Sequence, residues 1–185
     1  MVSGLLEYDL LRDLGIFVLL GVGLIEEGAK LLLPLVFYFI GRYRSEASGI
    51  LLGIASAMGF AALETMGYGF VTLLASRGNL ALLEEALLAR GLASPAGHAA
   101  WTGLVCAVLW RERQRTGATV INARIVGAFA TAVILHALWD TFNGLRGATF
   151  VDWASIELLS LAVAVVSLVL LVRRVREASR SLDRG

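Results

Sequence analysis

Three ionisable side chains lie inside the first long apolar stretch of the sequence. Glu26, Glu27 and Lys30 stand within LLGVGLIEEGAKLLLPLVFYF, which is otherwise typical of a membrane-spanning helix. A charge that faces lipid costs about 2.5–3.5 kcal/mol even on the milder insertion scales. We therefore expect these groups to face a protein interior or a hydrated cavity, where carboxylates can activate water for hydrolysis.

Three later apolar stretches carry further ionisable residues, and both histidines of the chain are among them: Glu64, His98, His136 and Asp140. His136 and Asp140 are four residues apart and can share one helix face, as can Glu26 and Lys30. With the membrane orientation derived below, all of these groups fall near the middle or in the outer half of the bilayer. Agreement in depth across four helices favours one shared site.

Peptide hydrolysis needs an activated water, a group that stabilises the oxyanion and a proton donor for the leaving amine. Desolvation makes a buried glutamate a better general base. We expect Glu27 to be the base, because Lys30 can hold Glu26 ionised and fixed. The opposite assignment, with Glu26 as the base, stays open.

The other polar residues have supporting roles in this interpretation. Glu64 and His98 would orient the water or share its proton. His136 would donate to the oxyanion, with Asp140 selecting its tautomer.

A metal-dependent alternative uses the same residues. Glu64, His98 and His136 supply one carboxylate and two imidazoles, as in a catalytic zinc site with an open position for water. The sequence contains no HExxH motif, which would make zinc the first choice. The preferred interpretation therefore has no metal and no other cofactor.

The composition of the chain indicates that membrane helices position these residues. The 185 residues are 58% hydrophobic and only 17% charged, with a mean hydropathy of +0.78, whereas soluble domains carry about 25% charge. The net charge of +1 gives no reason to expect a nucleic-acid partner. The single cysteine, Cys106, excludes an intrachain disulfide.

The apolar stretches predict an all-α integral membrane protein with about five transmembrane helices in a single domain, 1–185. The expected spans are 14–40, 47–75, 95–110, 120–143 and 153–172. LALLEEALLAR, between the second and third spans, predicts a short amphipathic helix at the membrane interface that Gly91 ends. The protease-like core would cover about 14–145, followed by the fifth span and a basic cytoplasmic tail, 173–185.

Two sequence patterns concern packing and orientation. Gly49, Gly53, Ala57 and Ala61 recur every four residues, a spacing that lets membrane helices approach closely. Most loop arginines fall on one side of the expected spans, which predicts the N-terminus outside and the C-terminus in the cytoplasm. The fifth span carries no charge in its apolar stretch LLSLAVAVVSLVLLV and is expected to be an ordinary lipid-facing helix.

Four motifs in order along the chain resemble those of a known family. EEGAK is similar to EExxK/R, FAALE to FxxxE, GHAAWTG to a histidine motif at a helix start, and HALWD to HxxxD/N. Over about residues 20–145 the sequence resembles the PrsW family of intramembrane proteases, which is related to CAAX prenyl endopeptidases and bacterial immunity-type membrane proteases. The prenyl endopeptidase branch has histidine where this chain has Glu64, which argues against CAAX substrates.

The resemblance implies an intramembrane protease, and we expect it to hydrolyse membrane-anchored protein substrates. The depth of the polar residues places the expected cleavage in the outer half of the bilayer. The resemblance also places the base within the glutamate pair of the first motif. The alternative is a non-enzymatic membrane scaffold, or a small proton or ion pathway that uses the same carboxylates and histidines.

Overall fold

The computed structural model describes residues 16–144 and 153–182, and these residues form helices without any sheet. The ends of the predicted domain, the last residues of the basic tail and the segment 145–152 lie outside the described residues. The helices are α2 (Ile16–Ile40), α3 (Glu46–Ala75), α4 (Leu80–Ala93), the π-helical turn η1 (Pro95–Ala99), α5 (Ala100–Thr116), α6 (Ala123–Gly144) and α7 (Trp153–Leu182).

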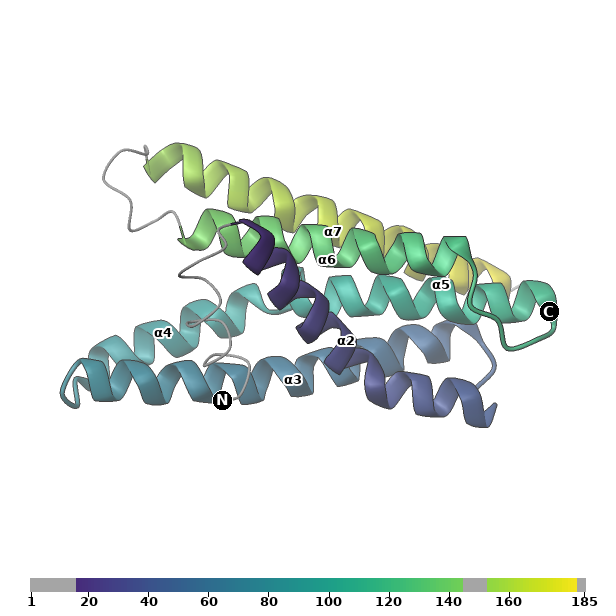
Figure 1. Ribbon diagram of the computed structural model, residues 1–185, viewed down its shortest axis with the longest axis horizontal. Helices are drawn as coiled ribbons and strands as arrows, with labels where there is room; N and C mark the ends of the chain where they lie inside the picture. The colour runs from purple at the N-terminus through teal and green to yellow at the C-terminus, as the bar shows by residue number, and fades with distance from the viewer. Residues whose placement is uncertain (1–15, 145–152, 183–185) are drawn as a thin grey trace.

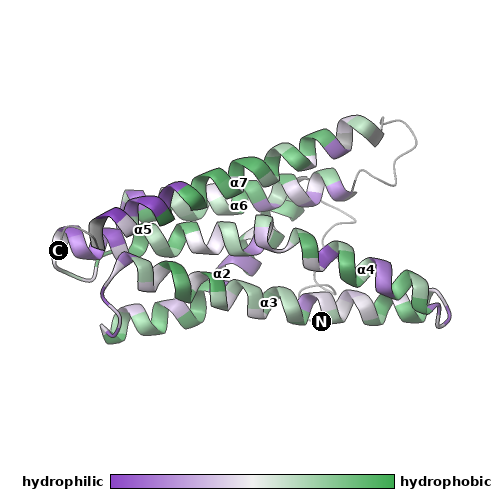
Figure 2. Cartoon of the chain, turned by 180° about the vertical axis from the view of Figure 1, so that it is seen from behind, coloured by the Kyte–Doolittle hydropathy of each residue, from purple (hydrophilic) through white to green (hydrophobic). Residues whose placement is uncertain are grey.

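Helix α5 forms the centre of the bundle. It packs against α3 on one side and against α6 and α7 on the other, while α2 crosses α3 and α6 (Figure 1). Most of α5 is buried, including the large side chains of Trp101 and Trp110. Large apolar side chains of α3 and α7 are exposed, as lipid contact requires. Hydrophobic residues make up much of both helices (Figure 2).

Within residues 16–144 and 153–182, four helical stretches are long and apolar enough to cross a membrane by length and composition: Glu46–Ala75, Leu80–Thr116, Ala123–Asn143 and Glu157–Arg180. The prediction of a polytopic helical membrane protein is thus confirmed, with four such stretches where about five were expected. Helix α2 has 25 residues, but the three charges in its middle distinguish it from the other four.

The predicted division between an interfacial helix and a short third span is wrong. Gly91 does not end α4, which continues to Ala93 and leads through η1 directly into α5. Helix α4 packs along α3 as the second arm of a hairpin (Figure 1). The break near Pro95 is a π-helical turn, a feature that is frequent at functional sites.

The predicted row of small residues is confirmed as the contact between α3 and α5. Gly49, Gly53, Ala57 and Ala61 are all buried. A Cβ atom on Gly53 would lie 2.8 Å from both the Thr102 carbonyl oxygen and the Cys106 Cβ atom. The two helix backbones can therefore be this close only because residue 53 has no side chain.

Pro34 explains a second contact between helices. Proline has no N–H, so the carbonyl of Lys30, four residues earlier, loses its helical partner. Ser56 of α3 donates its hydroxyl to that carbonyl at 2.6 Å. This bond ties α3 to α2 at the residue that carries the buried lysine.

Candidate active site

The EEGAK segment of α2 faces the bundle interior. Glu26, Glu27 and Lys30 are at most 2% exposed, which confirms that these charges avoid lipid. Lys30 Nζ lies 2.8 Å from Glu27 Oε1 and 3.4 Å from Glu26 Oε2. The expected pair of Lys30 with Glu26 forms, but Glu27 is not free, because the lysine makes its shorter contact with Glu27.

His136 of α6 reaches the same two glutamates. Its Nδ1 lies 2.9 Å from Glu27 Oε1, and its Nε2 lies 3.5 Å from Glu26 Oε2. A carboxylate only accepts hydrogen bonds, so Nδ1 carries the hydrogen in this contact. The predicted pair with Asp140 also forms, with Nε2 3.3 Å from Asp140 Oδ2.

Two residues of the GHAAWTG segment complete this cluster. Thr102 donates its hydroxyl to Glu27 Oε2 at 3.0 Å. Trp101 stacks on the His136 ring, with centroids 4.7 Å apart and planes inclined by 24°. Both residues lie within a quoted motif, but the sequence alone did not assign them these partners. We call Glu27, Lys30, Thr102 and His136 the closed network, because every side chain in it is buried and paired.

Helix α7 exposes large apolar side chains as expected of a lipid-facing helix, but one of its residues also supports the site. Trp101 donates its indole N–H to the Ser167 hydroxyl at 2.8 Å. Ser167 is 1% exposed and itself donates to the Val163 carbonyl. Serine at this position therefore links α7 to the ring that stacks on His136.

A second set of side chains lies beside the closed network. His98, on the π-helical turn η1, places Nε2 3.2 Å from Glu64 Oε2 of α3. Arg90 of α4 contacts the other oxygen, with Nη2 2.8 Å from Glu64 Oε1. The arginine also lies over the Tyr68 ring at 3.8 Å. Arg90 is not among the predicted site residues, because its segment was expected to lie at the membrane interface.

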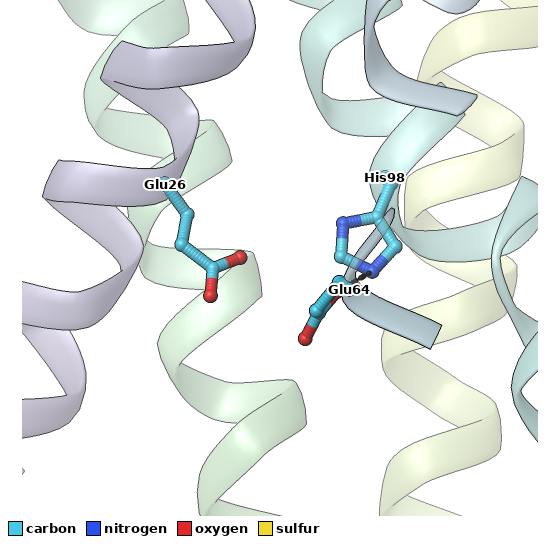
Figure 3. Close-up of side chains that lie close together, drawn as sticks. All are labelled: Glu26, Glu64 and His98. Carbon is cyan, nitrogen blue, oxygen red and sulfur yellow. Dashed lines mark ion pairs between the residues drawn. The ribbon is translucent and has the colours of Figure 1, made fainter. Parts of the chain in front are cut away.

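Three of the predicted site residues face one another across the helices. Glu26, Glu64 and His98 each offer one atom, and these atoms lie within 4.8 Å of one another. Their side chains approach a common space from α2, α3 and η1 (Figure 3). We call these three residues the open group.

Two buried atoms of the open group lack a hydrogen bond, although one of them, Glu64 Oε2, lies 3.2 Å from His98 Nε2. Glu64 Oε2 and His98 Nδ1 make no hydrogen bond within the described part of the chain, although both are buried. Such orphaned atoms are costly in a folded protein and call for an explanation such as an ion or water. His136 is close to this group, with its ring centroid 5.8 Å from that of His98.

The charges around this space do not balance. Among the described residues, four carboxylates, on Glu26, Glu27, Glu64 and Asp140, gather around three side chains that can carry positive charge: Lys30, Arg90 and His136. Excess negative charge in an interior is stabilised by a cation. The donor set, its unpaired atoms and its charge therefore fit a divalent metal ion.

Together the fold and the site define a multi-pass α-helical membrane protein with a carboxylate–histidine centre enclosed between its helices. The model of the PrsW family of intramembrane metalloproteases matches residues 3–172, so the chain belongs to that family. It is thus an intramembrane protease, and its substrates are proteins. No curated protein and no solved structure matches the chain.

This result corrects the prediction that no cofactor is required. The family is one of metalloproteases, and the structure provides a group of Glu and His donors that could hold a metal ion. The group also differs from the alternative set of zinc ligands. Glu64 and His98 belong to it as expected, whereas Glu26 stands in the place expected for His136.

Proposed function

We propose that the chain cleaves membrane-anchored proteins at a centre in which Glu26, Glu64 and His98 hold a divalent cation. The single observation that carries this proposal is the approach of their three donor atoms to within 4.8 Å of one another. Imidazole and carboxylate donors are common in catalytic zinc sites. Bound there, the cation would polarise the scissile carbonyl and make water more acidic.

His136 would move the proton in this proposal. Its Nδ1 is occupied by Glu27 Oε1 at 2.9 Å, so Nε2 is the atom left to transfer a proton. Nε2 points to the region of the open group, 3.5 Å from Glu26 Oε2. We assign His136 as the donor to the leaving amine, and Asp140 as the second acceptor that orients Nε2.

Glu27 would hold His136 rather than act as the base. Its two oxygens accept from Lys30, Thr102 and His136, which leaves little capacity for a proton from water. Arg90 would hold Glu64 in the same way, through the contact with Oε1 that leaves Oε2 facing His98. Such outer contacts orient the donors of a metal site.

The proposal also includes the membrane orientation. Arginines gather at one end of the bundle, where α5 and α7 end and α6 begins (Figure 2). The positive-inside rule places this end in the cytoplasm. Helix α2 would then also cross the membrane, in addition to the four long apolar stretches, with its charges shielded by α3 and α6. Cleavage would occur in the outer half of the bilayer after lateral entry of the substrate.

A chelator experiment tests the proposal. The purified protein would be reconstituted with a panel of fluorescent single-span reporter proteins and assayed before and after chelation. We expect cleavage to disappear on chelation and to return on addition of Zn²⁺ or another divalent cation. The variant Glu46→Gln is a matched control, because Glu46 is a buried glutamate at the far end of α3 that pairs with Arg111. Cleavage that survives exhaustive chelation would reject the proposal.

A further inference from the structure

A cavity lies between α5, α6 and α7 at the basic end of the bundle, away from the candidate active site. Its volume is about 480 Å³, within the size range of small-molecule sites. Three arginines line it, one from each helix: Arg111, Arg124 and Arg174. Among the described residues that line it, Glu112 is the one acidic side chain.

The wall of the cavity has two kinds of surface. The arginines form its charged part, while Val108 and Leu170 belong to an apolar part that continues along α5 and α7. A ligand that fits both parts has an anionic head and an apolar tail. Basic pockets between membrane helices are known to bind anionic lipid headgroups.

The arginines keep hydrogen-bonding capacity for such a head. A guanidinium has five N–H donors. In the described bonds, Arg124 uses Nη1 towards Glu112, and Arg174 uses Nη1 towards Glu177. Arg111 uses Nε and Nη1 towards Glu46 and Glu177. These bonds hold the side chains in place, and at least one nitrogen of each guanidinium is left for a phosphate.

We propose that this cavity binds the headgroup of an anionic phospholipid from the adjacent leaflet, with its acyl chains along the apolar wall. The occupant is a lipid rather than a soluble phosphate, because the cavity lies in a membrane protein and joins charged and apolar surface. The bound lipid would fix α7 against α5 and α6. Because α7 also holds Trp101 through Ser167, the lipid would stabilise the helix that supports the closed network.

Native mass spectrometry of the full-length protein in detergent tests the proposal, with phosphatidylglycerol as the probe and phosphatidylcholine as the neutral comparison. We expect one phosphatidylglycerol to be retained per chain, bound at least ten-fold more tightly than phosphatidylcholine. The double variant Arg124→Gln/Arg174→Gln should bind it at least ten-fold more weakly. Glycerol 3-phosphate at the same concentration should not compete, which separates a lipid from a soluble phosphate.

Two further variants distinguish the loss of this lipid site from unfolding and from a general loss of positive charge. Arg176→Gln/Arg180→Gln removes two exposed arginines from the same end of α7 that do not line the cavity, and it should bind phosphatidylglycerol like the wild type. Thr131→Trp fills the cavity without changing its charge and should weaken binding even if the arginine variant unfolds. Equal loss in both double variants, or unchanged binding in Thr131→Trp, would overturn the proposal.

Discussion

The closed network and the open group are built from similar residues, but they differ in how completely their polar atoms are hydrogen-bonded. In the closed network, Glu27 is fully buried and accepts from three side chains. In the open group, Glu64 and His98 are partly exposed and each has a buried atom without a hydrogen bond. Complete pairing suits a network that holds geometry, whereas unpaired donors suit a group that binds a ligand. Burial alone therefore does not identify the reactive carboxylate.

The largest effect is expected from His98→Ala and Glu64→Gln, which remove donors of the open group. Each change should lower the cleavage rate by about 10³-fold or more, since the cation site loses one of its three protein donors. The rate of reporter cleavage in vesicles is the measurement, with Glu46→Gln as the matched control. If either variant cleaved within a few-fold of the wild-type rate, the open group would not be the reactive part of the site.

A smaller loss is expected when the closed network is broken without changing its shape. Glu27→Gln should lower cleavage by about 10–100-fold, as outer-shell changes do, because His136 loses the carboxylate that accepts from Nδ1. It should also lower the free energy of unfolding by about 3 kcal/mol, since Lys30 loses its closer partner. Cleavage and thermal unfolding would be measured on the same preparation. A loss as large as that of His98→Ala would make Glu27 part of the reaction rather than its support.

Substitution of Arg90 tests whether a neighbouring side chain also holds the open group in place. Arg90→Gln removes the contact to Glu64 Oε1 and should reduce cleavage by about 10-fold. Arg90→Lys should recover part of this loss, because it keeps the charge. Arg77→Gln, at the exposed tip of the same hairpin, is the control and should be silent. If Arg77→Gln and Arg90→Gln have equal effects, general charge and not the contact with Glu64 is responsible.

The smallest effect on activity is expected from Gly53→Ala, which acts on the closed network through the backbone. The added Cβ would push against the Thr102 carbonyl oxygen, so the free energy of unfolding should fall by about 1–3 kcal/mol. Cleavage should fall only a few-fold. Gly59→Ala on the same helix meets no atom within 4 Å and should leave stability unchanged or slightly raised. Thermal unfolding of both variants in detergent distinguishes these outcomes.

Much of the fold could be predicted because long apolar stretches and interrupting charges are local features of the sequence. The predicted spans 14–40, 47–75 and 120–143 end within a few residues of α2, α3 and α6, whereas α5 and α7 extend well beyond the predicted ends at 110 and 172. The row from Gly49 to Ala61 correctly predicted the close packing of α3. The continuity of α4 with α5 could not be predicted, because Pro95 and Gly91 usually end a helix and here lead into a π-helical turn. Hydropathy likewise gave no sign that Ser167 of α7 reaches Trp101.

The sequence predicted which residues belong to the candidate site better than it predicted which of them contact one another. Spacing along one helix brought Glu26, Glu27 and Lys30 together, but which glutamate lies closer to the lysine depends on the rotamers that α3 and α6 permit. Contacts between helices, such as Thr102 with Glu27 and Arg90 with Glu64, have no signature in a single sequence. These contacts favour a supporting role for Glu27 over the predicted role as the base.

Metal analysis of the purified wild type, His98→Ala and Glu27→Gln tests the central claim most directly, since it measures the ion rather than the reaction. Our account predicts about one divalent cation per chain in the wild type and in Glu27→Gln, and less than about a tenth of that in His98→Ala. A wild type that carries no stoichiometric metal after reloading, or a His98→Ala variant that keeps it, would contradict the account.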